Sequence, residues 1–266
     1  MGLRDRGGLA KPHAARPRIA AARRLYSLSM GNGLADTAGS LRLFRAFNID
    51  VYVHWSWFIF AAFMYQFVGV HNPPWFLAVY LSLFAIVVMH EYGHALACRS
   101  VGGFVKHIVL WPLGGVAFVK PPERPGPTLW TIAAGPLVNV ALAPITYVLW
   151  LTLGEGVTEM SAQNLLGSYL FALMAMNLVL LIFNMLPIYP LDGGQVFQSI
   201  LWFIIGRARS IQIAAGTGMV LGVILGAVAL AHQRWLIVVI SVFILMQAYN
   251  GIQYARYLAA HEPQRS

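Results

Sequence analysis

The sequence predicts an all-α polytopic membrane protein with six transmembrane helices and a small β-hairpin between the second and third spans. Three observations support this fold class: 59% of the residues are hydrophobic and only 10% are charged, long uncharged runs recur along the chain, and the basic residues are unevenly distributed. A soluble domain normally has about 25% charged residues. The composition therefore indicates a protein whose surroundings are largely lipid.

The apolar runs are long enough to cross the hydrocarbon core of a bilayer, which takes about 20 helical residues. Six runs meet this requirement, at residues 51–70, 75–98, 129–153, 164–187, 211–231 and 235–254. The apolar stretch at residues 196–205 is too short to cross alone. We interpret it as the end of a broken or interfacial helix.

The basic residues predict the orientation of these spans. Nine of the 18 Lys and Arg residues precede the first span, which places that end of the chain in the cytoplasm. Six alternating crossings then leave only Arg234 outside, so both termini are expected to be cytoplasmic. The net charge of +9 is explained by this orientation, and we expect no nucleic-acid partner.

Three parts of the chain are predicted from these patterns. Residues 1–48 are expected to be a basic, disordered cytoplasmic tail, residues 49–258 the six-span domain, and residues 259–266 a short cytoplasmic tail. The single cysteine, Cys98, excludes an internal disulfide. Between the second and third spans, β-rich runs at 104–111 and 116–119 flank a turn, which is typical of a hairpin.

An HExxH motif lies at the end of the second span, where residues 90–94 read HEYGH. His90 and His94 are four residues apart and share one helix face, so both imidazoles can reach one Zn²⁺. Glu91 can reach a metal-bound water, as in metalloproteases. Two histidines and a glutamate in a membrane helix are costly unless a metal, partner groups or a water cavity compensates.

A catalytic zinc site usually has three protein ligands, so one more is needed. Asp192 is the best candidate, because the other acidic residues lie in tails, loops or span ends. Pro187 and Pro190 end the fourth span, and the following glycines allow unusual backbone angles. The alternating topology places this turn at the same membrane face as the HExxH motif. A simple helix-ending turn is the alternative.

Three motifs together resemble the signature of the site-2 protease family: HEYGH at 90–94, GPLVN at 135–139 and NMLPIYPLDGG at 184–194. The resemblance covers residues 51–254 and is closest to the compact six-span branch without appended regulatory domains. It implies intramembrane proteolysis with one Zn²⁺ per chain. By this resemblance His90, His94 and Asp192 are zinc ligands and Glu91 is the catalytic acid and base.

Asn139 matches a family asparagine that engages substrate or supports the transition state. An interhelical hydrogen bond is an equal alternative for this residue. The family's counterpart of the hairpin forms a small sheet near the active site. An exposed edge there could pair with an unwound substrate strand, or the hairpin could only cover the site.

The sequence therefore predicts a zinc metalloendopeptidase that cuts membrane-spanning proteins, and release of a regulatory protein into the cytoplasm is expected by resemblance. Its partners are a membrane-spanning substrate and the lipid bilayer, and a homo-oligomer is left open. A bacterial plasma membrane is the expected location. The alternatives are a transporter or channel and an inactive protease-like binding protein. The transporter is disfavoured because no inverted repeat is evident and the polar residues converge on one site.

Overall fold

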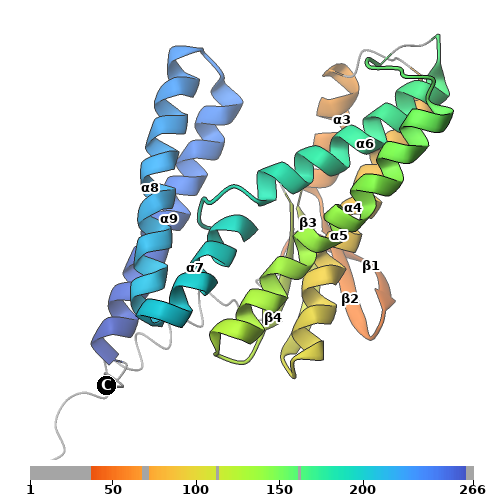
Figure 1. The fold of residues 1–266 in the computed structure, drawn as a ribbon. Helices are drawn as coiled ribbons and strands as arrows, with labels where there is room; N and C mark the ends of the chain where they lie inside the picture. Colours follow the sequence, from red (N-terminus) through yellow and green to blue (C-terminus); the bar gives the residue numbers. More distant parts are fainter. Residues whose placement is uncertain (1–36, 68–71, 112–113, 161–162, 262–266) are drawn as a thin grey trace, which may run out of the picture.

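The structure is a computed structural model that describes residues 37–67, 72–111, 114–160 and 163–261. Figure 1 shows long helices with a small sheet against one of them. The elements in chain order are β1 (Ser40–Ala46), β2 (Ile49–His54), α3 (Ser56–Phe67), α4 (Pro73–Ser100), β3 (Phe104–Trp111), β4 (Gly114–Lys120), α5 (Pro125–Leu153), α6 (Leu165–Asn184), α7 (Asp192–Ile205), α8 (Arg207–Ala231) and α9 (Trp235–His261).

Within the described ranges, five helices are long and apolar enough to span a membrane: α4, α5, α6, α8 and α9. They correspond to the second to sixth predicted spans. Their lipid-accessible faces carry large exposed apolar side chains, including Leu81, Val148, Val179, Val223 and Val239. This is the pattern expected of helices surrounded by hydrocarbon, and it confirms a mostly helical multi-pass protein.

The first predicted span, residues 51–70, is wrong as a single helix. Its first residues belong to strand β2, and helix α3 has only 12 residues, or about 18 Å at 1.5 Å per residue. The error has a physical cause: a buried strand followed by an apolar helix produces one continuous apolar run. Ile49, Val51 and Val53 are buried at alternate positions, which is the period of a strand.

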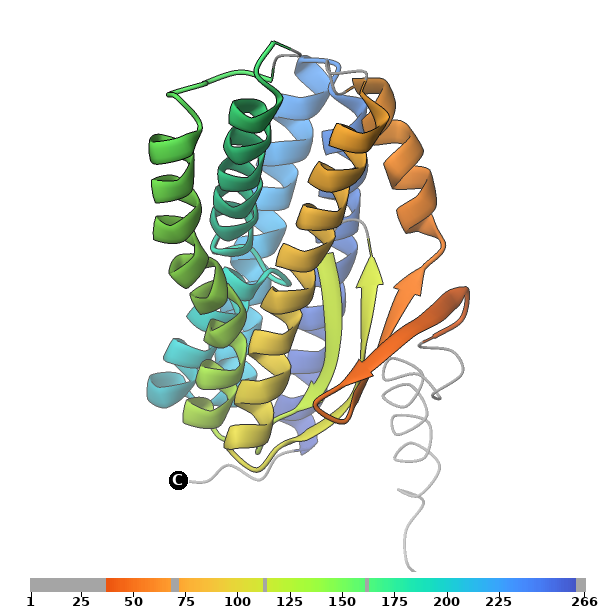
Figure 2. The same ribbon diagram turned by 90° about the vertical axis from the view of Figure 1, so that its right-hand side faces the viewer.

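The predicted hairpin between the second and third spans is present, as β3 and β4, and it belongs to a larger sheet. The strand order is β1-β2-β3-β4. The outer pairs are antiparallel, whereas β2 and β3 are parallel, with Val51 opposite Ile108. Figure 2 shows this sheet lying along α4. The parallel pairing of β2 with β3 therefore brings together two segments that are separated in sequence by α3 and α4.

The sheet and α4 share the main apolar cluster. Val51, Ile108 and Leu110 of the sheet pack in one cluster with Val87 and Ala95 of α4, and all are buried. Because Ala95 lies one residue after His94, this packing fixes the part of α4 that carries the HExxH motif.

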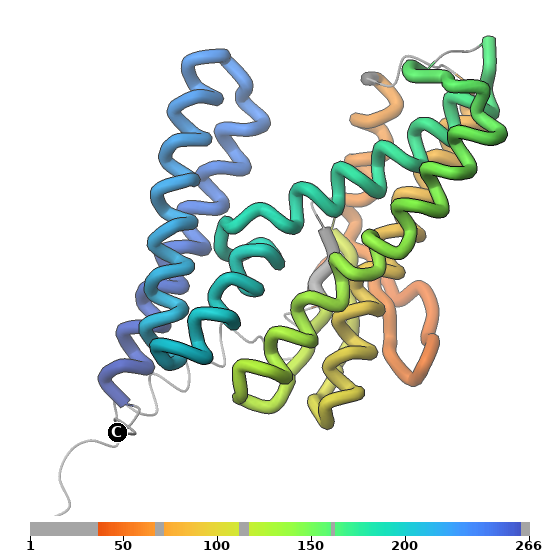
Figure 3. The backbone as a smooth tube through the Cα atoms, viewed as in Figure 1, coloured from red at the N-terminus to blue at the C-terminus, as the bar shows by residue number. Residues whose placement is uncertain are grey.

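Helix α6 ends at Asn184 and the chain turns before α7 begins at Asp192. Figure 3 follows this path from α6 into α7 and then into the α8–α9 pair. Figure 1 shows α8 and α9 side by side at one flank of the molecule, with α7 between them and α5. The short helix α7 corresponds to the broken or interfacial helix expected at residues 196–205, and it begins four residues before that range, at Asp192.

The predicted tail boundaries differ from the ordered fold. Strand β1 occupies Ser40–Ala46 and pairs with β2, so the fold includes residues that were expected in the tail. Tyr92 of α4 donates a hydrogen bond to the Ala46 carbonyl over 3.2 Å, which ties β1 to the helix. Helix α9 continues to His261, past the predicted boundary at 258. The remaining tail residues, 1–36 and 262–266, lie outside the described residues.

Candidate metal centre

Helix α4 presents both histidines of the HExxH motif to one point. His90 and His94 lie one helical turn apart, and their side chains are buried, at 3% and 6% exposure. Their Nε2 atoms are 3.1 Å apart. The spacing follows from the helix itself, because residues i and i+4 lie one above the other on the same face.

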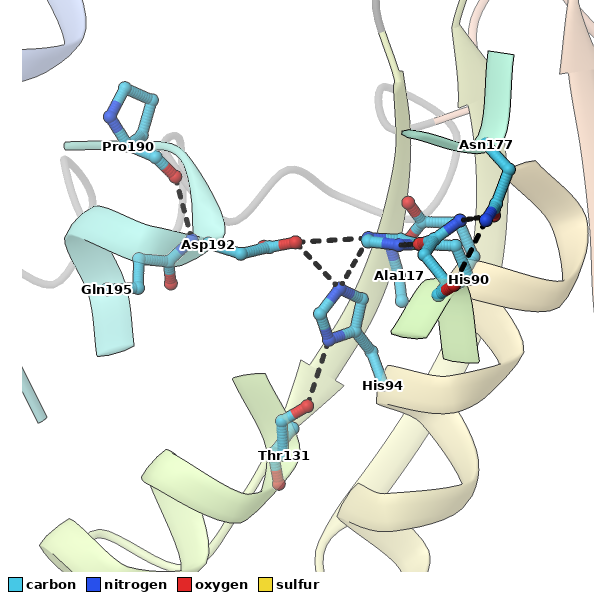
Figure 4. A network of polar contacts seen from close by, with 10 residues as sticks. His90, His94, Ala117, Thr131, Asn177, Pro190, Asp192 and Gln195 are labelled. Atoms are coloured by element: carbon cyan, nitrogen blue, oxygen red, sulfur yellow. Dashed lines mark hydrogen bonds and ion pairs between the residues drawn. The ribbon is translucent and has the colours of Figure 1, made fainter. Parts of the chain in front are cut away.

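Asp192, the first residue of α7, completes this group from the opposite side (Figure 4). Its Oδ2 lies 3.0 Å from Nε2 of His90 and 3.3 Å from Nε2 of His94. The three side chains form a cluster with the ligand atoms needed to hold a metal ion. The structure therefore brings together residues that are 102 positions apart in the chain.

The outer nitrogen of each imidazole bonds to an oxygen acceptor. Nδ1 of His90 is 2.6 Å from Oδ1 of Asn139, and Nδ1 of His94 is 2.9 Å from the Thr131 carbonyl. Both Nδ1 atoms must donate in these bonds, since a carbonyl oxygen can only accept. Each neutral imidazole then turns the lone pair of its Nε2 toward the centre, as in metal-ligating histidines.

These geometries fit a zinc ion. Two Nε2 lone pairs and a carboxylate oxygen converge on one point, which is a donor set that can hold a metal cation. Ligands about 2.0 to 2.1 Å from a tetrahedral zinc lie about 3.3 to 3.4 Å from one another. The observed separations of 3.0, 3.1 and 3.3 Å are close to this value.

Gly135 of α5 leaves the space beside these ligands open. A Cβ placed on Gly135 would overlap Nε2 of His94 and would lie 2.8 Å from Nε2 of His90. No larger residue fits there without displacing an imidazole. Helix α5 therefore approaches the centre with bare backbone, while Thr131, on the same helix, supplies the carbonyl that bonds to His94.

Asn139 of α5 is held in turn by Asn177 of α6. Nδ2 of Asn139 donates to Oδ1 of Asn177 over 2.8 Å, and Nδ2 of Asn177 donates to the Asn139 carbonyl over 3.0 Å. Both side chains are completely buried. The pair fixes which end of the Asn139 amide faces His90, so the bond network runs from α6 through α5 to α4.

Glu91 lies beside the cluster and faces strand β4. Its Oε2 accepts a hydrogen bond of 2.9 Å from the backbone N–H of Ala117, and its side chain is 4% exposed. It is not one of the three clustered ligand groups. The arrangement leaves its carboxylate next to the centre without occupying it.

The turn before Asp192 is tightly folded. The Leu191 N–H donates to the Ile188 carbonyl over 2.8 Å, and Nε2 of Gln195 donates to the Pro190 carbonyl over 2.8 Å. A Cβ on Gly193 would overlap the Met185 carbonyl oxygen, so this residue must be glycine for the turn to close. Asp192 also lies at the N-terminus of α7, where the helix dipole favours a negative charge.

Sequence reasoning found the ligand candidates but missed their supports. Asn177 was not singled out, although an amide in the interior of an apolar span is itself a signal of a buried polar contact. The Thr131 carbonyl and the Ala117 N–H are backbone groups, so no residue type could have revealed them. The role of Gly135 also needed the packing of α5 against α4.

A helical membrane bundle with an HExxH helix and a converging aspartate defines a membrane-embedded metallopeptidase fold. The family model for Peptidase family M50 matches residues 78–163 and 151–227 of this chain. The chain belongs to this family, and the resemblance to site-2 proteases drawn from its motifs is confirmed.

Individual relatives agree with this placement. The chain is 29% identical to the zinc metalloprotease MJ0392 of Methanocaldococcus jannaschii, covering 79% of this chain and 59% of that protein. It is 34% identical to the putative zinc metalloprotease sll0528 of Synechocystis, covering 74% of this chain and 53% of that protein. It thus spans little more than half the length of these relatives. The solved structure of a site-2 protease from M. jannaschii matches with a TM-score of 0.60 and 26% identity, covering 80% of this chain and 95% of that one.

Proposed function

We propose that this protein is an intramembrane zinc metalloprotease that binds one Zn²⁺ through His90, His94 and Asp192. The observation that carries the proposal is the convergence of three ligand atoms whose imidazoles are already oriented through their outer nitrogens. The relatives named as zinc metalloproteases support the choice of metal. Two imidazoles and one carboxylate also form a ligand set that occurs in zinc peptidases.

Glu91 is the catalytic acid and base in this proposal. A bound Zn²⁺ would lower the pKa of a water molecule and polarise the scissile carbonyl. Glu91 takes a proton from the attacking water and later gives one to the leaving amine. The Ala117 N–H holds its carboxylate at the edge of the centre, and burial excludes bulk solvent from the transfer.

Asn139 acts by orienting His90. Its Oδ1 accepts from Nδ1 of His90, and its Nδ2 donates to Asn177. Both ends of the amide are therefore used within the protein. This supports the interhelical alternative raised from the sequence, with the added consequence that the bond reaches a metal ligand.

The substrate is a membrane-spanning protein, which must expose an extended peptide bond to the site. Strand β4 lies at the end of the four-stranded sheet, with β3 on one side. The N–H of Ala117 on β4 points to Glu91, which places this strand beside the general base. Pairing of an unwound substrate segment with β4 would bring its peptide bonds to the centre.

The positive-inside pattern supports a plasma-membrane protein with cytoplasmic termini and an active site toward the cytoplasm. Cleavage in this orientation releases a regulatory protein into the cytoplasm. A transporter is disfavoured because His90, His94 and Asp192 gather at one point, whereas a transport path needs polar groups in series. The presence of Glu91 beside both ligands disfavours an inactive relative.

The decisive experiment replaces Glu91 with glutamine. The full chain, Glu91→Gln and the exposed control Glu159→Gln are purified in detergent and assayed for bound zinc and for cleavage of a single-span substrate. We expect Glu91→Gln to keep zinc and to cut about 100- to 10,000-fold more slowly, while Glu159→Gln matches the parent. A zinc-loaded Glu91→Gln variant that cuts at the parental rate would refute the role of Glu91.

A further inference from the structure

The turn that precedes Asp192 is seated in the α8–α9 pair through Tyr189. A Cβ placed on Gly251 of α9 would lie 2.8 Å from Cε1 and 3.3 Å from Cδ1 of the Tyr189 ring, and 3.1 Å from the Ala215 Cβ. A Cβ on Gly218 of α8 would lie 2.8 Å from the Tyr189 carbonyl oxygen. We call this surface, formed by Ala215, Gly218 and Gly251, the tyrosine slot. Gly251 leaves room for the ring of Tyr189, and Gly218 leaves room for its backbone.

The connection from Tyr189 to Asp192 is short and internally bonded. Two hydrogen bonds close the turn, from the Leu191 N–H to the Ile188 carbonyl and from Gln195 to the Pro190 carbonyl. On the other side of Asp192, a Cβ on Gly194 would overlap the backbone nitrogen of Tyr189. A displacement of Tyr189 therefore carries the backbone of Asp192 with it.

Asp192 depends on its backbone position more than the histidines do. His90 and His94 each have a second hydrogen bond, to Asn139 and to the Thr131 carbonyl. Among the described residues, the Asp192 carboxylate bonds only to the two imidazoles themselves. The position of the Asp192 carboxylate is therefore set by the backbone turn that precedes it and by the residues that pack against this turn.

We propose that Tyr189 is a positioning residue, and that the tyrosine slot of α8 and α9 sets the location of Asp192 at the metal centre. This inference rests on the proposed role of Asp192 as a zinc ligand. It assigns the α8–α9 pair a function beyond spanning the membrane. A change in the packing of this pair against Tyr189 alters the position of Asp192, three residues further along the chain.

The test uses a matched pair of glycines on the same helix. Gly218 contacts Tyr189, whereas a Cβ on Gly216 meets nothing within 4 Å. The full-length variants Gly218→Ala and Gly216→Ala are purified in detergent, and zinc affinity is measured by competition with a chelator. The visible absorption of the Co²⁺-substituted proteins reports ligand geometry. We expect Gly218→Ala to lose about tenfold in zinc affinity, the range of changes to groups supporting a metal ligand, and to shift the Co²⁺ spectrum. Gly216→Ala should match the parent in both.

The slot also predicts a specific rescue. In Gly251→Ala the new methyl meets the ring of Tyr189, so adding Tyr189→Leu should restore most of the lost affinity. In Gly218→Ala the new methyl meets the Tyr189 backbone, so adding Tyr189→Leu should not restore zinc affinity. Tyr189→Phe should match the parent, since the slot contacts ring carbons. A general loss of stability would not produce this pattern.

Two outcomes separate this inference from the proposed function. If folded Gly218→Ala keeps parental affinity and spectrum while Asp192→Ala loses both, the slot does not position Asp192 but the zinc site stands. If Asp192→Ala itself keeps zinc and an unchanged spectrum, the proposed ligand set is wrong. Should the glycine variants fail to fold, Tyr189→Leu alone decides: parental affinity and spectrum in this variant would overturn the inference.

Discussion

His90 and His94 reach the metal centre from a helix whose neighbours bond to their outer nitrogens, whereas Asp192 reaches it from a turn that packs against α8 and α9. The first side is fixed by hydrogen bonds that join α4, α5 and α6. The second is fixed by steric fit at glycines. The comparison teaches that one site can be preorganised by two means, and that different substitutions should disturb each.

Removing a ligand from either side has the largest expected effect. Both His94→Ala and Asp192→Ala should lower zinc affinity by more than about 100-fold, beyond the loss expected for supporting groups. In their metal-free forms, the two variants should differ in the stability that each loses. His94→Ala leaves the Thr131 carbonyl without this partner, which costs about 1 to 3 kcal/mol of stability, whereas Asp192→Ala removes only the contacts between its carboxylate and the two imidazoles.

Chelator competition and thermal unfolding of the metal-free proteins measure these two effects. Equal loss of stability in both variants would contradict the distinction between a bonded side and a packed side.

Gly135→Ala should come next, because its methyl would enter the space of both imidazoles. We expect zinc affinity to fall by about 100-fold, at the upper end for residues that do not bind the metal themselves. Gly126→Ala is the control on the same helix, since a Cβ there meets only Phe203 at 3.9 Å. The expected pattern fails if Gly135→Ala binds zinc as tightly as Gly126→Ala.

Asn177→Ala should have a smaller effect, acting on His90 through Asn139. It removes the acceptor for Nδ2 of Asn139 and the donor to its carbonyl, so the amide that orients His90 is less constrained. We expect about a tenfold loss of zinc affinity. Asn250→Ala, at an exposed position of α9, serves as the control. Equal affinities would show that Asn139 holds its orientation without α6.

The sequence allowed the HExxH side of the centre to be predicted because helix periodicity alone places His90 and His94 together. Asp192 was inferred by elimination, and its ligand role remains a proposal. Long apolar runs predicted five of the helices, since length and composition determine whether a helix can span.

Other features depend on contacts between distant segments. Strand β2 was hidden within an apolar run, and its parallel pairing with β3 joins residues on either side of α3 and α4. The hydrogen bonds from Asn177 and the fit of Tyr189 against Gly218 and Gly251 likewise arise from tertiary packing. Composition and periodicity do not encode which small residue faces which ring.

The separation of the ligands along the chain also sets an order of assembly. Asp192 follows His90 by 102 residues, which a ribosome takes about 5 to 20 s to add. During this interval the nascent chain holds both histidines and Glu91 but lacks Asp192, and α8 and α9 are added later still. The cluster of His90, His94 and Asp192 is therefore completed only after most of the surrounding bundle has been made.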